Sequence, residues 1–297
     1  MTGIICIDKP QGITSFTAVN RVRRILGTKK AGHTGTLDPM ATGVLPIMLG
    51  GATKFADYLP THTKAYEADI LFGVATDTYD VTGKVLETSD KSVSFEDFSN
   101  AAQTFLGETE QLPPMYSAVS QNGVRLYKLA RQGVEVEREK RSITIFSINT
   151  APTDEKNVFT LSVSCSAGTY IRSLANDIGE KLGCPACLKR LRRTEANGFT
   201  LDDTLSIDSL TELAESGEIQ QYIKSVDSVL GVYPEISVTD AQSKRFSNGG
   251  ALSFDRLKNF NKQDGFFRVY SPDRRFLGLG LSNPSKGQLE VAKLYIP

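Results

Sequence analysis

The feature that most restricts the fold of this chain is a change of hydrophobic period in its second half. Between residues 158 and 165, apolar residues alternate with Thr and Ser, which is typical of a strand with one buried face. After residue 168 they recur at helical spacing, and Gly183 stands where a left-handed cap would end the helix. The sequence therefore predicts a strand that leads into a helix, with Tyr170 and Arg172 near a sheet edge, where ligand-binding groups are often placed.

Other segments also combine strands with helices. A strand is expected at residues 4–8, followed by a helix for which Ser15 is the predicted N-cap and Gly27 the C-terminal cap. Further strands are predicted at 65–74 and 84–86, and a helix at 95–106. After about residue 226, short β-rich pieces predict a small second domain; they are residues 266–270, 276–281 and 289–295.

A glycine-rich segment at residues 32–43 holds a single aspartate, Asp38. Pro39 biases Asp38 towards an extended conformation, and the glycines permit close approaches of the backbone. A carboxylate in such a loop can face a ligand. An Asp-Pro pair is also a common surface turn, so the segment alone leaves both interpretations open.

The net charge is zero, with 34 basic and 34 acidic residues, but the charges are segregated along the chain. Residues 1–60 hold seven Lys or Arg against three Asp, whereas residues 61–110 hold three basic and ten acidic residues. Basic clusters occur again between Lys189 and Arg193 and in residues 231–297. Separated basic clusters suggest an anionic polymer as partner, although a solvated face explains each cluster by itself.

The segment 111–133 mixes tyrosines with cations. Tyr116 and Tyr127 are interleaved with Arg125, Lys128 and Arg131, a combination that lines grooves for nucleic acid. A loop that packs its tyrosines on the core is the alternative.

Membrane, secretory and metal-binding classes receive no support. No apolar run approaches the roughly 20 residues of a membrane span, and the N-terminus lacks the features of a secretory signal. A cytoplasmic location is expected, where the four cysteines would be free thiols. Cys184 and Cys187 form a single pair, and only His33 and His62 offer imidazole ligands, so no metal site is expected.

A set of short segments in a fixed order carries a family resemblance. They are Asp8-Lys9-Pro10 with Gly12 and Thr14-Ser15; Gly32-His33-Thr34-Gly35 with Leu37-Asp38-Pro39 and Ala41-Thr42-Gly43; the strand with Tyr66; Gly73 with Thr76-Asp77 and Asp80; Thr169-Tyr170-Ile171-Arg172; and Leu191-Arg192-Arg193-Thr194. With these residues the chain resembles the TruB family of tRNA pseudouridine-55 synthases over most of its length.

The resemblance implies an α+β fold: a mixed, mainly antiparallel sheet flanked by helices, with a small C-terminal β-barrel similar to the PUA domain, an RNA-binding module. The implied catalytic domain covers residues 1–230, including an RNA-binding loop region at 111–140. The implied PUA-like domain covers residues 231–297.

The resemblance also implies the chemistry. Such an enzyme isomerises a uridine in the tRNA T-loop by breaking the N-glycosidic bond, turning the uracil and rejoining it through carbon, with no cofactor. Asp38 would be the catalytic carboxylate and could attack the anomeric carbon, add to C6 or take the 2′ proton. Arg172 would pair with it, because an opposite charge favours the ionised form in a dry pocket. Tyr66 would stack on the target base.

Further roles follow from the same resemblance. Substrate contacts are implied for His33, Tyr170, Leu191, Lys9 and Pro10, of which Lys9 and Pro10 would brace the floor of the site. For Leu191, core packing is an alternative. Phosphate contacts are predicted for Arg125, Lys128, Arg131, Lys189, Arg190, Arg192 and Arg193.

The expected partner is the T-arm of tRNA, bound by a monomer that needs no protein partner. Two other interpretations stay open. One is an RNA-binding or tRNA-folding factor, and the other is the catalytic subunit of a guide-RNA complex.

Overall fold

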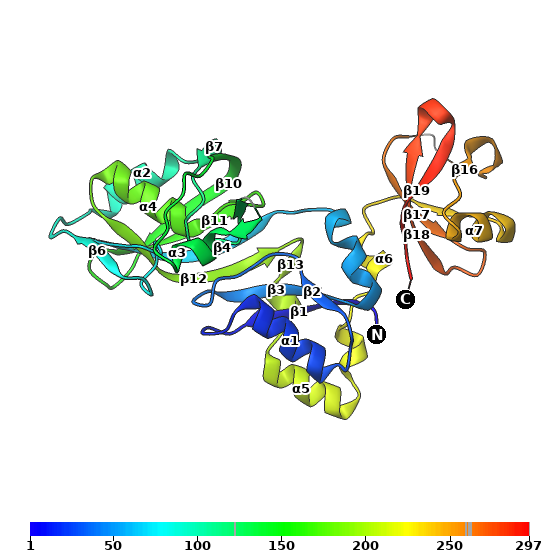
Figure 1. Cartoon of the computed structure of the whole chain (residues 1–297), viewed down its shortest axis with the longest axis horizontal. Coiled ribbons are helices and arrows are strands. Elements are labelled where there is room, and N and C mark those ends of the chain that lie inside the picture. Colours follow the sequence, from blue (N-terminus) through cyan, green and yellow to red (C-terminus); the bar gives the residue numbers. More distant parts are fainter. Residues whose placement is uncertain (122, 259, 261–262, 297) are drawn as a thin grey trace.

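A computed structural model describes residues 1–121, 123–258, 260 and 263–296, and shows a large α+β part beside a small β part (Figure 1). The large part contains a ten-stranded sheet with the path β14-β1-β3-β12-β4-β11-β10-β7, to which β2 and β13 are added at β3 and β12. Its strands are β1 Gly3–Lys9, β2 Ala31–His33, β3 Thr42–Leu49, β4 Lys64–Phe72, β7 Gly107–Gln111, β10 Arg141–Pro152, β11 Val158–Cys165, β12 Ala186–Ala196, β13 Phe199–Thr200 and β14 Thr204–Leu205.

The sheet is mixed and mainly antiparallel, as expected. Only the pairs β1–β14 and β3–β12 are parallel among the described strands of this sheet. The helices are α1 Ser15–Ile25, α2 Phe95–Gln103, α3 Leu126–Ala130, α4 Ile171–Leu182, α5 Ile207–Ser216, α6 Val226–Val229 and α7 Asp240–Ser247. None of the described helices is long and apolar enough to cross a membrane.

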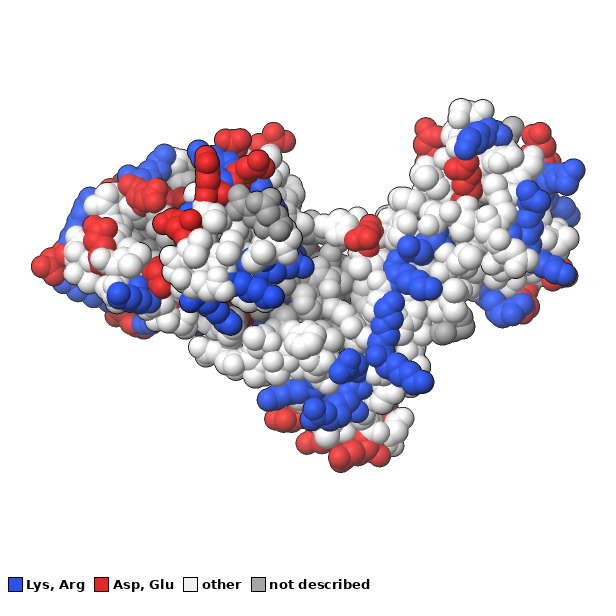
Figure 2. All heavy atoms as spheres, in the orientation of Figure 1, with Lys and Arg blue, Asp and Glu red and all other residues white. Residues whose placement is uncertain are grey.

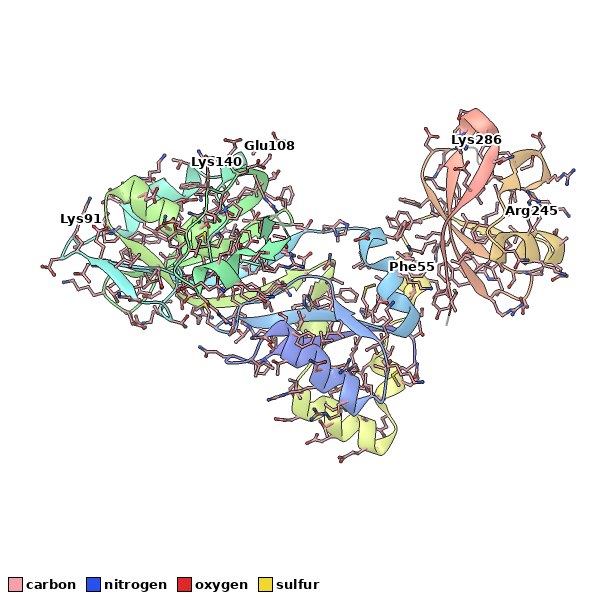
Figure 3. All side chains as sticks on the ribbon, in the orientation of Figure 1. Phe55, Lys91, Glu108, Lys140, Arg245 and Lys286 are labelled. Atoms are coloured by element: carbon pink, nitrogen blue, oxygen red, sulfur yellow. The ribbon has the colours of Figure 1, made fainter. Side chains whose placement is uncertain are left out.

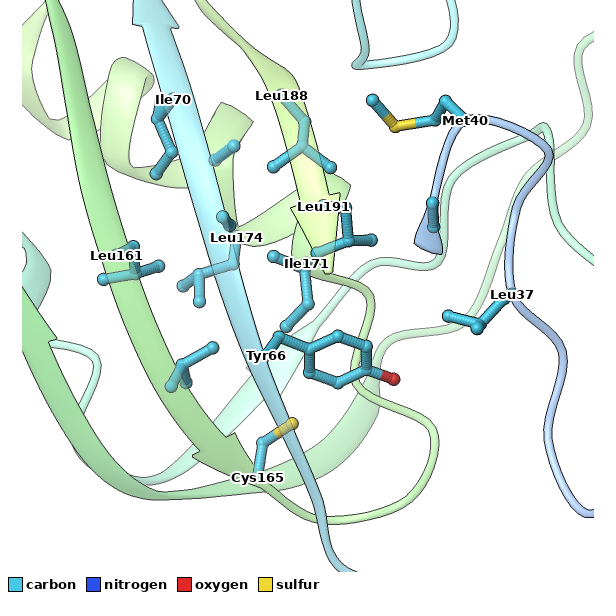
Figure 4. Packing of buried hydrophobic residues seen from close by; sticks show 14 of the residues in the cluster. Leu37, Met40, Tyr66, Ile70, Leu161, Cys165, Ile171, Leu174, Leu188 and Leu191 are labelled. Atoms are coloured by element: carbon cyan, nitrogen blue, oxygen red, sulfur yellow. The ribbon is translucent and has the colours of Figure 1, made fainter. Parts of the chain in front are cut away.

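The change of period at residue 166 has the predicted outcome. Strand β11 pairs antiparallel with β4 and β10, and α4 follows it, ending at Gly183 with a φ of 59°. Leu161 from β11 and Leu174 from α4 meet in the main core, on the helix-covered face of the sheet (Figure 4). The first turn of α4 therefore stands at the end of a strand and is fixed by core packing.

Three local predictions were wrong in detail. Thr14, not Ser15, is the N-cap of α1, because its hydroxyl accepts the Thr17 N–H at 3.0 Å. The strand predicted at 65–74 stops at Phe72, because Gly73 has a φ of 95° and its N–H bonds the Pro185 carbonyl. After it, β5 Val74–Thr76 pairs with β6 Val85–Thr88. The helix predicted at 95–106 ends at Gln103.

Apart from Gln111, which ends β7, the segment 111–133 lies outside the main sheet, but it is not a plain loop. It contains the short pair β8 Ser120–Gln121 and β9 Val124–Arg125, followed by α3, whose Leu126 is buried. The 3-10 helix η1 Gly50–Tyr58 follows β3 and lies at the junction with the small part (Figure 1).

The small part has its own sheet and core. The path is β15-β17-β18-β19-β16, with β15 Glu235–Ser237, β16 Leu252–Ser253, β17 Phe266–Tyr270, β18 Phe276–Asn283 and β19 Gln288–Leu294. Phe246 of α7 is fully buried against this sheet. Phe55 of η1 lies at the junction (Figure 3), and its ring centroid is 6.1 Å from that of Phe276 and 6.2 Å from that of Tyr295. The domain boundary between residues 230 and 231 stays a prediction.

Candidate active site

The loop that carries Asp38 is fastened at several points. The Ser15 hydroxyl accepts the Leu37 N–H at 2.7 Å and donates to the Leu37 carbonyl at 3.0 Å, so the helix α1 side chain fixes the residue before Asp38. The Gly12 N–H bonds the Pro39 carbonyl at 2.8 Å. Asp38 is therefore held from both sides rather than placed on a free surface turn.

Arg172, in the first turn of α4, bonds Asp38 and two further segments. Its Nε donates to Asp38 Oδ2 at 2.8 Å, and its two terminal nitrogens donate to the carbonyls of Thr78 and Tyr116, each at 2.8 Å. The Arg172 side chain is only 4% exposed, whereas that of Asp38 is 32% exposed. The guanidinium is thus a buried fixed charge that presents the carboxylate to the solvent side.

A second carboxylate lies on the same guanidinium. Asp80 Oδ2 is 3.9 Å from Arg172 Nε, and Asp80 Oδ1 accepts hydrogen bonds from the Thr78 hydroxyl and from Thr82. The sequence analysis quoted Asp80 within a matching segment but gave it no role. The surrounding Thr residues, which can hold a buried carboxylate in a turn, were the available signal.

Asp38 and Arg172 line a cavity of about 870 Å³. This volume is within the range of small-molecule sites and is large enough for a nucleoside. Four other residues predicted to be catalytic or to contact the substrate also line it: His33, Tyr66, Tyr170 and Leu191. Phe16 of α1 also lines the cavity and is 70% exposed, which is unusual for a large apolar side chain.

Tyr66 is buried in β4, and its phenol oxygen extends from the apolar cluster towards the Leu37 side of the site (Figure 4). Burial raises the pKa of the Tyr66 hydroxyl above its usual value, so the phenol keeps its proton at neutral pH. Leu191 of β12 packs in the same cluster and also lines the cavity, so the two interpretations of this residue are both compatible with its position. The two side chains give the cavity one aromatic and one aliphatic wall.

The peptide of Tyr170 is clamped by Gln111 of β7. The Gln111 side chain accepts the Tyr170 N–H at 2.7 Å and donates to the Tyr170 carbonyl at 3.0 Å. Burial also raises the pKa of the Tyr170 hydroxyl. This side chain therefore enters the cavity as a neutral phenol from a fixed backbone.

Lys9 and Pro10 lie beneath the site and are not among the residues that line the cavity. The fully buried Lys9 ammonium donates to the carbonyls of Pro10 and Ile13 at 2.8 Å, and to that of Pro39 at 3.5 Å. Burial lowers the Lys9 pKa to about 8, with the nearby Asp38 opposing this shift. Direct substrate contact by Lys9 is excluded in this arrangement, and a bracing role is compatible with it.

The basic run 189–193 does not form the cluster that its sequence suggested. It belongs to β12, where successive side chains point to opposite faces of the sheet. Arg193 has no exposed surface and donates to the carbonyls of Val44, Thr36 and Gly35, so a phosphate contact by Arg193 was a wrong prediction. It is instead a brace of the Asp38 loop.

The other three cations of the run are already paired with acids. Arg190 bonds Asp69 and Glu67, Arg192 bonds Asp8, and Lys189 bonds Glu155. Arg190 and Arg192 lie on the sheet face opposite Leu191, because their positions alternate with it along β12. Neither of these two arginines lines the cavity. The phosphate contacts of Arg190, Arg192 and Lys189 stay predictions.

The cations of the 111–140 region lie nearer to the cavity. Arg131 and Tyr127 both line it, with the guanidinium 5.5 Å from the centre of the Tyr127 ring. Arg125 bonds the Ala118 carbonyl, and Lys128 of α3 is exposed. Within the described residues, no three His, Cys, Asp or Glu side chains lie close enough together to hold a metal ion.

Comparisons with known proteins agree on one family. Three family models match in succession: the N-terminal domain of TruB family pseudouridylate synthases (residues 23–171), the tRNA pseudouridylate synthase B C-terminal domain (172–231) and the C-terminal region of pseudouridine synthase II TruB (234–291).

Curated relatives extend this similarity to the whole chain. The chain is 43% identical to the tRNA pseudouridine synthase B of Clostridium kluyveri over 296 residues, covering 100% of both chains. It is 39% identical to that of Bacillus pumilus, covering 97% of this chain and 96% of the relative.

Solved structures share the fold. A chain from the structure of an H/ACA RNP bound to a substrate RNA containing 2′-deoxyuridine has a TM-score of 0.72 at 23% identity, covering 99% of this chain and 85% of its own. A chain from a Cbf5-Nop10-Gar1 complex has the same TM-score at 25% identity, with the same coverage.

Proposed function

The chain belongs to the TruB family of pseudouridylate synthases, and we propose that it isomerises uridine to pseudouridine at position 55 in the T-loop of tRNA, with Asp38 as the reacting carboxylate. The proposal rests mainly on one observation: a partly exposed Asp38 bonded to a buried Arg172 in a nucleoside-sized cavity. The relatives named tRNA pseudouridine synthase B support the class of substrate.

The two oxygens of Asp38 have different tasks in this mechanism. Oδ2 accepts the Arg172 Nε–H, and no hydrogen bond to Oδ1 occurs among the described residues. Oδ1 is therefore the atom that reacts with the nucleoside, at the anomeric carbon, at C6 or at the 2′ proton. Arg172 holds the carboxylate in one orientation, because its other two donors are already bonded to backbone carbonyls.

The uridine must leave the stacked T-loop to reach Asp38. Extrusion costs on the order of a few kcal/mol, and stacking on an aromatic ring returns about 1–3 kcal/mol per base. Tyr66, which lines the cavity, is the proposed stacking partner. Tyr170 and Leu191 would confine the detached uracil, so that it rejoins through carbon instead of escaping.

Binding of the RNA backbone is assigned in this proposal to two groups of cations. Arg131 lines the cavity, and Arg125 and Lys128 are exposed residues of the same segment. The second group is on α1, where Arg21, Arg23 and Arg24 are exposed. Figure 2 shows a band of basic side chains over α1 and η1, beside the hollow between the two parts of the molecule. The hollow between the large and small parts would accept the tRNA arm.

We further infer that the protein acts alone, as a cytoplasmic monomer. The solved neighbours come from complexes that contain other proteins, but the relatives with full-length similarity carry the name of a tRNA enzyme. A guide-RNA subunit is therefore the less favoured function. A tRNA-binding factor without activity is also less favoured, because Asp38, Tyr66 and Arg172 meet at one cavity.

The test is to incubate unmodified tRNA transcript with wild-type protein and with Asp38→Asn, and to measure pseudouridine in the T-loop. Wild type should convert the uridine, and Asp38→Asn should bind tRNA with similar affinity but form no product. Conversion without Asp38, or the absence of conversion by wild type, would reject the proposal.

A further inference from the structure

Three nitrogen-bearing side chains gather at the wall of the cavity beside the Asp38 loop. Lys64 begins β4, two residues before Tyr66, and His33 ends β2. Both line the cavity, and the buried Arg193 lies behind them. A Cβ placed on Gly35 would lie 3.0 Å from Lys64 Nζ and 3.6 Å from an Arg193 nitrogen, so the cations converge on this turn.

No carboxylate is paired with this group within the described part of the chain. The Lys64 ammonium has neither a hydrogen bond nor an ion pair there. Burial and the charge of Arg193 lower the pKa of Lys64, with the Cys165 thiol opposing, and burial with the charges of Arg193 and Lys64 lowers the pKa of His33. His33 Nδ1 is buried without a hydrogen-bond partner among the described residues. Arg193, by contrast, donates to three backbone carbonyls and also interacts with the Tyr66 hydroxyl.

Such an arrangement costs stability in the free protein. A cation removed from water and placed beside another cation is unfavourable unless an anion joins it. In contrast, Arg190 and Arg192 on the opposite sheet face are each paired with carboxylates. The wall of the cavity therefore has the electrostatic character of a site that lacks its anion.

We propose that Lys64, with His33 beside it, binds a backbone phosphate of the nucleotide that enters the cavity. This inference rests on the proposed function, which supplies an RNA whose everted nucleotide carries a phosphate on each side. Lys64 is close in sequence to Tyr66, and His33 precedes Asp38 by five positions in the same fastened loop. A phosphate held here would fix the sugar while the base faces Tyr66 and the ribose faces Asp38.

A purely structural role for Lys64 predicts different behaviour. A lysine that only braces the Gly35 turn should stabilise the protein, so its removal would lower the melting temperature. A phosphate ligand that is uncompensated in the free protein should do the opposite: Lys64→Met should raise Tm, by about 2–4 °C. At the same time the variant should bind tRNA about 10- to 100-fold more weakly, as expected for a lost hydrogen bond to a charged group.

The closing experiment compares wild type, Lys64→Met, Lys64→Arg and the control Lys91→Met on a T-arm stem-loop. Lys91 is exposed, bonds the Leu182 carbonyl and lies at the far end of the large part (Figure 3). Single phosphates around the target uridine are replaced in turn by uncharged methylphosphonates, and Kd, KM and kcat are measured. Wild type and Lys91→Met should lose about tenfold or more in affinity at one linkage, whereas Lys64→Met should lose nothing further at that linkage.

Lys64→Arg, which keeps a cation, should recover most of the affinity. In Lys64→Met the KM should rise with kcat nearly unchanged, because the contact is present before and during the reaction. Equal losses for Lys64→Met and wild type at every linkage, or a lower Tm together with unchanged affinity, would overturn the inference. Failure of wild type to form pseudouridine would instead reject the proposed function, so the two failures are separable.

Discussion

Arg172→Lys is the substitution that most directly tests how the active site is built. Lysine keeps the positive charge but has a single ammonium, which cannot reach Asp38, the Thr78 carbonyl and the Tyr116 carbonyl together. All three distances are 2.8 Å in the native protein, and the arginine side chain is only 4% exposed. The variant should therefore leave two buried hydrogen-bonding groups without a donor.

The magnitude follows from this count. A hydrogen bond that involves a charged group contributes about 1.5–3 kcal/mol, so losing two should lower the free energy of unfolding by about 3–6 kcal/mol. Asp38→Asn should cost only about 1 kcal/mol, because it alters one bond to a carboxylate that is 32% exposed. In a double-mutant cycle, the coupling between the two positions should be about 1 kcal/mol, well below the cost of Arg172→Lys alone.

Urea unfolding of wild type, both single variants and the double variant measures these terms. Pseudouridine formation under single-turnover conditions gives the catalytic side: Asp38→Asn should be inactive, and Arg172→Lys should be slower by at least about 100-fold. If Arg172→Lys unfolds within about 0.5 kcal/mol of wild type, or if its whole cost appears as coupling to Asp38, the guanidinium does not join the three segments as described.

Three further predictions concern the surroundings of the site. Lys9 has a pKa of about 8 in the folded protein and 10.5 in the unfolded chain, so between these pH values the unfolded chain binds more protons. The free energy of unfolding of wild type relative to Lys9→Met, measured at pH 7.5 and 9.5, should therefore rise with pH by up to about 1.4 kcal/mol per unit. A difference that does not change with pH would contradict the lowered pKa. Arg131→Glu should reduce the salt dependence of tRNA affinity, whereas Lys91→Glu, at the far end of the large part, should leave it unchanged. Equal slopes in both variants would place the RNA elsewhere. Gly43→Ala should lower the free energy of unfolding by about 3 kcal/mol. Gly43 has a φ of 103°, and a Cβ at this position would lie 2.1 Å from the Arg193 carbonyl oxygen. A loss below about 1 kcal/mol in urea unfolding would mean that the backbone shifts to relieve this contact.

The parts that sequence predicted well are those determined by neighbouring residues. Strand β11 and helix α4 follow from the period of their own apolar positions, and Gly183 ends the helix as a local cap. The pairing of Arg172 with Asp38 came from the family resemblance, since nothing between the two positions indicates it.

The parts that were missed depend on distant backbone. Arg193 is buried because the carbonyls of Gly35, Thr36 and Val44 surround it, and no property of the run 189–193 reveals those partners. Strand β12 was also hidden by a bulge between Leu188 and Arg190, which interrupts the alternation. Asp80 was overlooked for the same reason: its contact with Arg172 joins segments far apart in sequence.

The ring cluster at η1 has a consequence for how the protein is made. Tyr295, near the very end of the chain, packs on Phe55, and a Cβ on Gly51 would lie 2.1 Å from the Ile296 carbonyl oxygen. During translation the Phe55 surface stays without these partners until Phe276 and Tyr295 have been made. We expect a chain truncated before β19 to bind a hydrophobic dye that the complete protein ignores; an equally weak dye signal from both would show that other residues cover the surface first.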